Sequence, residues 1–319
     1  MFNIRKALVM AGALVLTVAL TLTISQPTVS APAPFGEDSR ARALGELTPG
    51  AGGTQSAPGG RPSRDGAVKI AILDTGIDLD HPGLPVAGDV TFVDGTSSGD
   101  DSHGHGTMVA GVVAELIRDG YGGEGAPAIE LYAVKITDEY RLDSWATVIE
   151  GIDWAWQNGM HVVNMSFGGP DEPPEAVHRA LQRAHRRGVV LVAGAGNAGN
   201  LGLEDSVYYP ARYDEVIAVG ATDGSGARVR TSSTGPSLEL VAPGVGVETT
   251  TIGGYGAKRG TSVSSPYVAG VAALVIASGV TDTDRVRGML REMARDLGPA
   301  GWDESFGYGL VDASMVAAP

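Results

Sequence analysis

The chain has 319 residues, of which 43% are hydrophobic, a formal net charge of −14 and no cysteine. This hydrophobic content is enough for a sizeable core and excludes global disorder. The lack of cysteine excludes disulfides, thiolate metal sites and a cysteine nucleophile. The acidic charge should repel nucleic acid and anionic membranes, so nucleic acid is not expected as a partner.

The N-terminus has the order of charge and hydrophobicity that is typical of an export signal. Arg5 and Lys6 precede 18 uncharged residues, Ala7 to Ile24, and small residues follow. We predict a signal peptide at residues 1–30. The uncharged run is nearly long enough to span a bilayer, so a retained membrane anchor is the alternative. Both readings place the rest of the chain outside the cytoplasm, as a secreted or an anchored protein.

Residues 31–66 are rich in Gly, Pro, Ser and Ala, which predicts a flexible linker or a reduced prosegment. One domain is expected from residue 67 to residue 319. Short apolar runs predict strands at 67–73, 131–136, 161–167, 189–193, 215–221 and 238–242. Helical patterns lie at 107–118, between Ser144 and Asn158, between Pro173 and Gly188, and at 268–278 and 286–297. This alternation predicts an α/β fold, with a mostly parallel sheet covered by helices on both faces.

Ligands of such sheets bind beyond the carboxyl ends of the strands, where Asp74 follows the first predicted strand. Taken alone, Asp74 is typical of a turn. The stretch DDSHGHGTMVAG then carries His103 and His105, which supply only two of the three or four ligands that a metal needs. Further donors nearby are Asp78, Asp80, His81, Asp100 and Asp101. Alternatively, a carboxylate from Asp74 holds Nδ1 of His105 and leaves Nε2 as a base.

The stretch GTSVSSPYVAG, residues 260–270, is the candidate region for a nucleophile. Its small residues give close access, and the amides of the helix that follows can stabilise negative charge. We expect Pro266 in the first helical turn, where proline is tolerated. By itself, however, the segment is more typical of a Ser/Thr-rich helix cap.

Three segments, DTGID, HGTMVAG and GTSVSSP, occur in this order along the chain. Together they resemble the Asp, His and Ser boxes of the subtilisin-like serine proteases (subtilases), and the resemblance covers roughly residues 67–316. Segments between the boxes, such as VLVAGAGNAGN, also resemble that family. The resemblance implies a three-layer α/β/α fold and an extracytoplasmic serine endopeptidase that cleaves polypeptides through an acyl-enzyme.

The resemblance also implies a role for each matching residue. Ser262 would be the nucleophile, His105 the general base and Asp74 the residue that orients the imidazole. His103 would be a loop residue. The side-chain amide of Asn197 and the backbone N–H of Ser262 would form the oxyanion hole.

By the same resemblance, an extended substrate would pair with the backbone of Ser166, Phe167 and Gly168 on one side and of Asp138–Leu142 on the other. Tyr208 lies at a position near the primary specificity pocket that is often glycine in the family. If its ring points inward, small apolar side chains are preferred; if it points outward, larger ones fit.

No cofactor is expected for catalysis, and we expect a monomer. Family members often bind a stabilising calcium ion, but Gly83 and Arg118 stand at two of the positions concerned, which predicts that this site is absent and leaves other calcium sites open. Two other functions were weighed. A metallohydrolase using His103 and His105 would leave the Ser box unexplained. A non-catalytic binding module of the same fold would be expected to lack a catalytic residue, and none is missing.

Overall fold

The computed structural model describes residues 66–121, 128–139, 142 and 144–316. The predicted signal segment (1–30) and all of the predicted linker (31–66) except Gly66 lie outside the described residues. Within the described ranges, no helix combines the length and the apolar character needed to cross a membrane.

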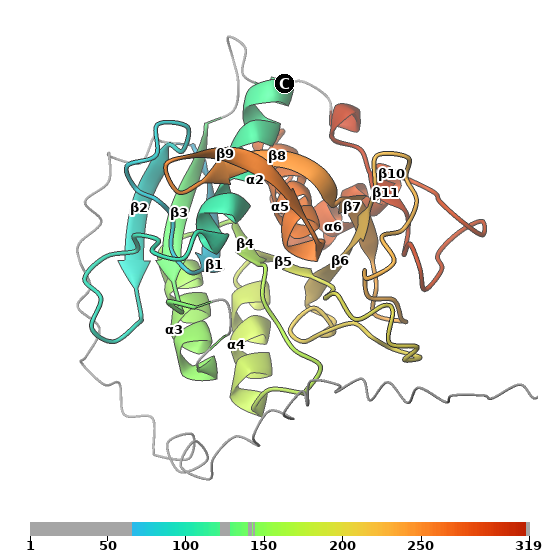
Figure 1. Ribbon diagram of the computed structural model, residues 1–319, viewed down its shortest axis with the longest axis horizontal. Coiled ribbons are helices and arrows are strands. Elements are labelled where there is room, and N and C mark those ends of the chain that lie inside the picture. The colour runs from blue at the N-terminus through green and yellow to red at the C-terminus, as the bar shows by residue number, and fades with distance from the viewer. Residues whose placement is uncertain (1–65, 122–127, 140–141, 143, 317–319) are drawn as a thin grey trace, which may run out of the picture. The chain divides into compact units, whose positions relative to one another are not determined.

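A nine-stranded sheet forms the centre of the described chain, in the order β10-β11-β7-β6-β5-β4-β1-β3-β2 (Figure 1). All neighbouring strands are parallel except β10 and β11. The six predicted apolar runs are all strands of this sheet. The strands are β1 (Val68–Asp74), β2 (Val86–Thr91), β3 (Ile129–Lys135), β4 (Val162–Met165), β5 (Val190–Gly194), β6 (Val216–Thr222), β7 (Leu240–Pro243), β10 (Ala294–Arg295) and β11 (Leu310–Val311).

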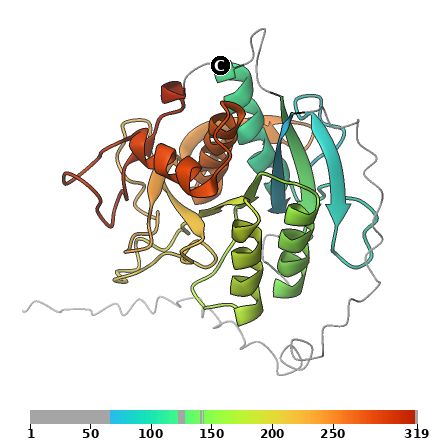
Figure 2. The same cartoon turned by 180° about the vertical axis from the view of Figure 1, so that it is seen from behind.

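Helices cover both faces of the sheet, which confirms the three-layer α/β/α fold (Figures 1 and 2). Because side chains alternate along a strand, Ile70 and Ile72 of β1 enter one core while Ala71 and Leu73 enter the other. A strand buried on both faces must be apolar throughout, which explains its uninterrupted apolar run. The first core includes residues of α2 (His105–Tyr121), α5 (Thr261–Ala277) and α6 (Thr283–Glu292); the second includes residues of α3 (Trp145–Gln157) and α4 (Glu175–Arg186).

Helix α5 begins seven residues before the predicted start at 268, so Pro266 lies inside the helix and not in its first turn. Proline has no N–H to donate to the carbonyl four residues earlier, which is that of Ser262. The hydroxyl of Ser166 donates to this Ser262 carbonyl instead, at 3.2 Å. Almost all of α5 is buried, so packing outweighs the weak helix propensity of its Ser/Thr-rich start.

The predicted last helix, 286–297, is also shifted. Helix α6 ends at Glu292, because Ala294 and Arg295 pair with β11 as an antiparallel strand. The edge strand β2 was not predicted either, since its sequence VAGDVT lacks a continuous apolar run.

A second sheet, also not predicted, is the hairpin of β8 (Val245–Thr251) and β9 (Gly254–Arg259), which passes over α2 (Figure 1). The hydroxyls of Thr249 and Thr250 donate to the carbonyls of Met108 and Thr107, each at 2.7 Å. A Cβ atom at Gly111 of α2 would overlap both hydroxyls. The glycine in HGTMVAG therefore allows the hairpin to dock on the helix.

We expect Gly111→Ala to lower the free energy of unfolding by about 1–3 kcal/mol, because the hairpin must move away from α2. Gly288→Ala in α6 is the matched control: its Cβ would have only Arg285 Nη1 within 4 Å, at 3.8 Å. This control should raise stability by about 0.4–1 kcal/mol. Urea denaturation of both variants measures the difference, and equal stability of Gly111→Ala and wild type would contradict the docking argument.

Candidate active site

The carboxylate of Asp74 and the imidazole of His105 form a buried pair at the carboxyl edge of the sheet. Asp74 is the last residue of β1 and His105 is the first residue of α2. Nδ1 of His105 lies 2.7 Å from Oδ1 of Asp74, which also accepts the N–H of Thr75 at 2.8 Å. The Asp74 side chain is 2% exposed and the His105 side chain 13%, so the imidazole is the part that reaches solvent.

The neighbours of His105 shift its pKa. Burial acts to lower the pKa of His105, but the charge and hydrogen bond of Asp74 and the charge of Asp101 act to raise it. The charge of Lys258 acts to lower the pKa of His105. The net result is that the pKa of His105 lies above its usual value of 6.5.

Asp101, which sequence reasoning considered only as a possible metal donor, holds the N-terminus of α2. Its Oδ1 accepts from the hydroxyl of Thr75 and from the N–H groups of His103 and Gly104, each at 2.9 Å. Its Oδ2 accepts from the N–H of Thr107 at 2.9 Å and from the Thr107 hydroxyl at 2.6 Å. A negative side chain is favourable here because it satisfies helix amides that have no partner within the helix.

Lys135, the last residue of β3, binds both the loop after β1 and the loop before α2, and its side chain is 2% exposed. Its Nζ donates to the carbonyls of Thr75 at 2.8 Å and Asp100 at 3.0 Å, and lies 2.6 Å from a carboxylate oxygen of Asp138. This role of Lys135 could not be predicted, because a lysine within an apolar run offers no indication of its partners. Residues 140 and 141 of the predicted substrate-binding segment Asp138–Leu142 lie outside the described residues.

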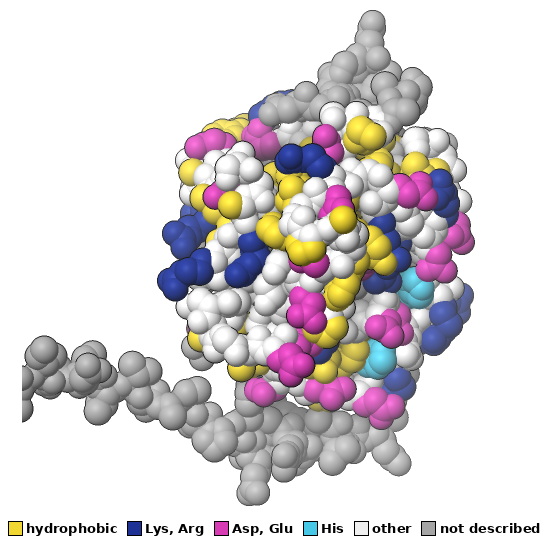
Figure 3. Space-filling model, turned by 90° about the vertical axis from the view of Figure 1, so that its right-hand side faces the viewer, with side chains coloured by type: hydrophobic (Ala, Val, Ile, Leu, Met, Phe, Trp, Pro, Cys, Tyr) yellow, Lys and Arg dark blue, Asp and Glu magenta, His cyan; other side chains and the backbone are white. Residues whose placement is uncertain are grey.

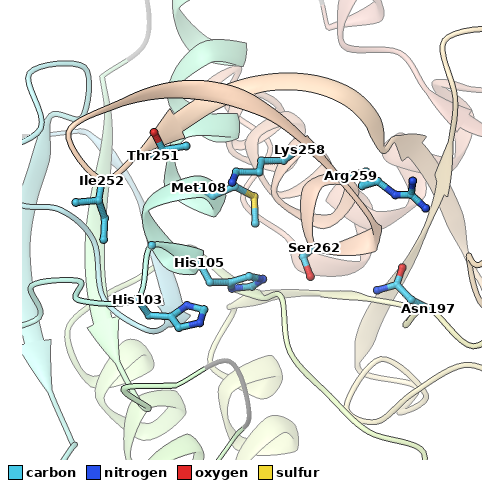
Figure 4. Close-up of a pocket in the computed structure, with 10 residues that line it drawn as sticks. His103, His105, Met108, Asn197, Thr251, Ile252, Lys258, Arg259 and Ser262 are labelled. Carbon is cyan, nitrogen blue, oxygen red and sulfur yellow. The ribbon is translucent and has the colours of Figure 1, made fainter. Parts of the chain in front are cut away.

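A cavity of about 500 Å³ brings the predicted nucleophile, base and amide donor together (Figure 4). Ser262 comes from the first turn of α5, His105 from the start of α2, and Asn197 from the loop after β5. Figure 4 shows Ser262 between His105 and Asn197. The hairpin and the loop before α2 complete the lining with His103, Gly104, Met108, Thr251, Ile252, Lys258 and Arg259.

Ser262 contacts the segment that was predicted to bind substrate. Its hydroxyl donates to the carbonyl of Ser166, 3.1 Å away. Ser166 and Phe167 follow β4, Gly168 is exposed, and the Phe167 ring lies 6.5 Å from the Trp145 ring of α3, between centroids. The structure thus places the Ser166–Gly168 segment, which becomes exposed at Gly168, beside Ser262.

The side chain of Asn197 is oriented by the start of α5. Its Oδ1 accepts the N–H of Thr261 at 3.3 Å, and the hydroxyl of Thr261 in turn accepts the N–H of Gly196 at 3.2 Å. With Oδ1 held in this way, the amide nitrogen of Asn197 faces Ser262 (Figure 4). Gly260, with φ of 119°, makes the sharp entry into the helix that this arrangement requires.

The ring of Tyr208 lies over Gly196. A Cβ atom at Gly196 would be 2.6–3.0 Å from three ring carbons, and a Cβ at Gly168 would be 3.5 Å from the Cβ of Tyr208. Tyr208 therefore packs between the loop that carries Asn197 and the Ser166–Gly168 segment. Of the two orientations left open by the sequence, this packing on Gly196 favours the inward one.

The alternative metal donors are engaged in other contacts. Both ring nitrogens of His81 have partners, the carbonyl of Gly254 and the N–H of Gly83, and Asp100 accepts the N–H of Leu79. His103 lies in the loop before α2, with its ring 6.5 Å from that of His105 between centroids. Over the ranges that the structure describes, no three His, Cys, Asp or Glu side chains form a group that could hold a metal ion.

The absence of the usual calcium site stays a prediction, and the surroundings of Gly83 and Arg118 are consistent with it. A side chain at Gly83 would overlap the hydroxyl of Tyr255, so the exposed Tyr255 side chain would have to move to make room for a carboxylate there. Arg118 lies within the uninterrupted helix α2 and pairs with Glu115. A positive charge on a regular helix offers none of the oxygen ligands that calcium requires.

Comparison with known proteins agrees with the geometry. Residues 65–309 match the subtilase family. Subtilisin DY of Bacillus licheniformis is 42% identical over 252 residues, which are 78% of this chain and 90% of that protein. Subtilisin E of Bacillus subtilis is 42% identical over 254 residues, again 78% of this chain but 65% of that longer protein.

A solved structure, that of a lanthipeptide protease, superimposes with a TM-score of 0.66 at 29% sequence identity and covers 77% of this chain and 85% of its own. The family match covers more than half of the chain, and the boxes recognised in the sequence lie within it. The chain belongs to the subtilase family of subtilisin-like serine proteases.

Proposed function

We propose that this protein is an extracytoplasmic serine endopeptidase that hydrolyses polypeptides through Asp74, His105 and Ser262. The observation that carries the proposal is the 2.7 Å contact between His105 and Asp74 at the wall of a cavity that also contains Ser262. Asp74 holds the proton on Nδ1, so Nε2 is the basic nitrogen and faces the cavity.

The reaction proceeds by two acyl transfers. Nε2 of His105 takes the proton from the Ser262 hydroxyl, whose oxygen attacks the peptide carbonyl. The protonated imidazole, stabilised by Asp74, gives that proton to the leaving amine, and an acyl-enzyme remains. A water molecule, deprotonated by the same nitrogen, then releases the acyl group. No metal is needed in this scheme, because the nucleophile and the base are both side chains of the protein.

The oxyanion of each tetrahedral intermediate would be held by Asn197 and the backbone N–H of Ser262. The hydrogen bond from Thr261 to Oδ1 of Asn197 fixes the amide before substrate arrives, which removes the cost of orienting it during the reaction. The positive end of α5 adds to this stabilisation, since Ser262 lies in its first turn.

The substrate would bind extended along Ser166–Gly168, and a monomer suffices because all the reacting groups come from one chain. The Tyr208 ring fills space beside this segment and limits the side chain on the acyl side of the scissile bond to small apolar groups. A bulky side chain would have to displace a ring that packs on Gly196.

A fluorophosphonate probe tests the proposed nucleophile. We expect mass spectrometry to find the label on Ser262, with labelling lost in Ser262→Ala and slowed by about 10⁴-fold or more in His105→Ala. Each variant should retain the wild-type circular dichroism spectrum. A folded, processed wild-type protein that takes up no label would reject the enzyme proposal in favour of a non-catalytic module.

The raised pKa of His105 predicts the acid side of the pH profile. His105 acts as a base only when neutral, so kcat/KM should fall as pH decreases through the pKa of the free enzyme. Because this pKa is raised, the midpoint should lie above 6.5. Initial rates on a peptide substrate measured from pH 5 to pH 9 give the value, and a midpoint well below 6.5 would contradict the assigned environment.

Replacing Tyr208 tests the limit on substrate size. We expect Tyr208→Gly to raise kcat/KM for a phenylalanine substrate, relative to an alanine substrate, by about tenfold or more. Tyr208→Phe keeps the ring and should keep the wild-type preference, which makes it the matched control. An unchanged preference in Tyr208→Gly would show that the ring does not limit the pocket.

A further inference from the structure

The proposed function determines which part of the cavity meets each half of the substrate, and the inference below rests on it. His105 must deliver a proton to the leaving amine, so the leaving fragment lies on the His105 side of Ser262. The oxyanion lies on the side of Asn197. Figure 4 shows these two residues on opposite sides of Ser262.

On the His105 side, the cavity is closed by Met108, Ile252 and Lys258. The Lys258 side chain extends from β9 across the cavity, and its amino end lies beside Met108 (Figure 4). Ile252, at the tip of the hairpin, is 50% exposed. The leaving fragment would therefore contact the apolar side chains of Met108 and Ile252 and the ammonium group of Lys258.

The charge of Lys258 is not cancelled by a nearby carboxylate. No ion pair to Lys258 occurs within the part of the chain that the structure describes. The described residues that line the cavity include Lys258 and Arg259 but no Asp or Glu. The carboxylates of Asp74 and Asp101, which act on His105, are buried and hold His105 and the start of α2.

This local charge is opposite to that of the whole chain, which carries −14. On the face seen in Figure 3, acidic side chains are interspersed with basic ones. A surface of net negative charge repels acidic peptides in general, so a cationic site inside the cavity would select them at short range. Lys258 also acts to lower the pKa of His105, which is consistent with its place in the lining of the same cavity.

We propose that Lys258 forms a specificity site for an acidic side chain on the residue directly after the scissile bond. A glutamate or aspartate at this position would place its carboxylate against the ammonium of Lys258, with its methylene groups near Met108 and Ile252. Arg259 is a poorer partner, because its side chain points to the side of Asn197 (Figure 4).

The expected size of the effect follows from the exposure of Lys258. An ion pair between exposed side chains changes a binding constant by about fivefold or less. A bound peptide would partly shield Lys258 from water, which strengthens the pair moderately. We expect kcat/KM for a glutamate substrate to exceed that for the matched glutamine substrate by about fivefold at low salt. The ratio should fall at 1 M salt, where charges are screened within about 3 Å.

The test uses internally quenched peptides that differ only in the residue after the scissile bond, which is glutamate, glutamine or lysine. Lys258→Met removes the charge and keeps the apolar stem. This variant should bring the glutamate-to-glutamine ratio close to one, and Lys258→Glu should favour lysine. Arg259→Met removes an equal charge from the next residue of β9 and should keep most of the wild-type ratio.

A peptide p-nitroanilide, which has no amino acid after the scissile bond, separates this inference from the proposed function. If wild type fails to cleave it, the enzyme proposal itself is rejected. If wild type cleaves it, but the wild-type glutamate-to-glutamine ratio is one, the acidic specificity is rejected. An equal loss of that ratio in Arg259→Met and Lys258→Met would also overturn the assignment, because it would indicate a diffuse field and not a site at Lys258.

Discussion

The carboxylate of Asp101 connects the loop after β1 to the N-terminus of α2, and the contact between Asp74 and His105 depends on the relative position of these two segments. It accepts hydrogen bonds from the N-terminus of α2 and from Thr75, the residue after Asp74. The two ends of the Asp74–His105 contact are thereby fixed to the same buried charge. Lys135 reinforces this by binding the carbonyls of Thr75 and Asp100. The 2.7 Å hydrogen bond between Asp74 and His105 needs this support, because a shift of 1 Å would remove most of its orienting effect.

Glycines determine how closely the other elements approach this centre. A Cβ atom at Gly106 would overlap the carbonyl of Gly76, and one at Gly111 would overlap the hairpin. The hairpin carries Lys258 and Ile252 over the cavity, so its docking on α2 links the packing of the fold to the shape of the site. The glycines of HGTMVAG are thus as important for building the cavity as the histidine is for its chemistry.

Helices and strands with a strong local hydrophobic pattern were predicted from the sequence. Elements whose structure depends on contacts with residues far along the chain were not. β1, β5 and β6 are apolar because both of their faces are buried, and this can be seen in the sequence. The hairpin strands VGVETTT and GYGAKR are partly exposed and lack such a pattern. For the site, the boxes indicated Asp74, His105, Asn197 and Ser262. The partners of Asp101 and Lys135 could not be predicted, since a single sequence does not show which loops meet.

The placement of Ser262 on α5 has a consequence for self-digestion. A protease is also a possible substrate of its own kind, and a folded chain is cut mainly when it opens. Because almost all of α5 is buried, exposing it requires loss of its packing on the central strands β1, β4, β5, β6 and β7. A molecule in which α5 has opened no longer holds Ser262 beside His105, so by the proposed mechanism it is a substrate for digestion but not an active enzyme. The lifetime of a preparation should depend on the rate at which intact molecules meet opened ones, and so on concentration as well as on stability.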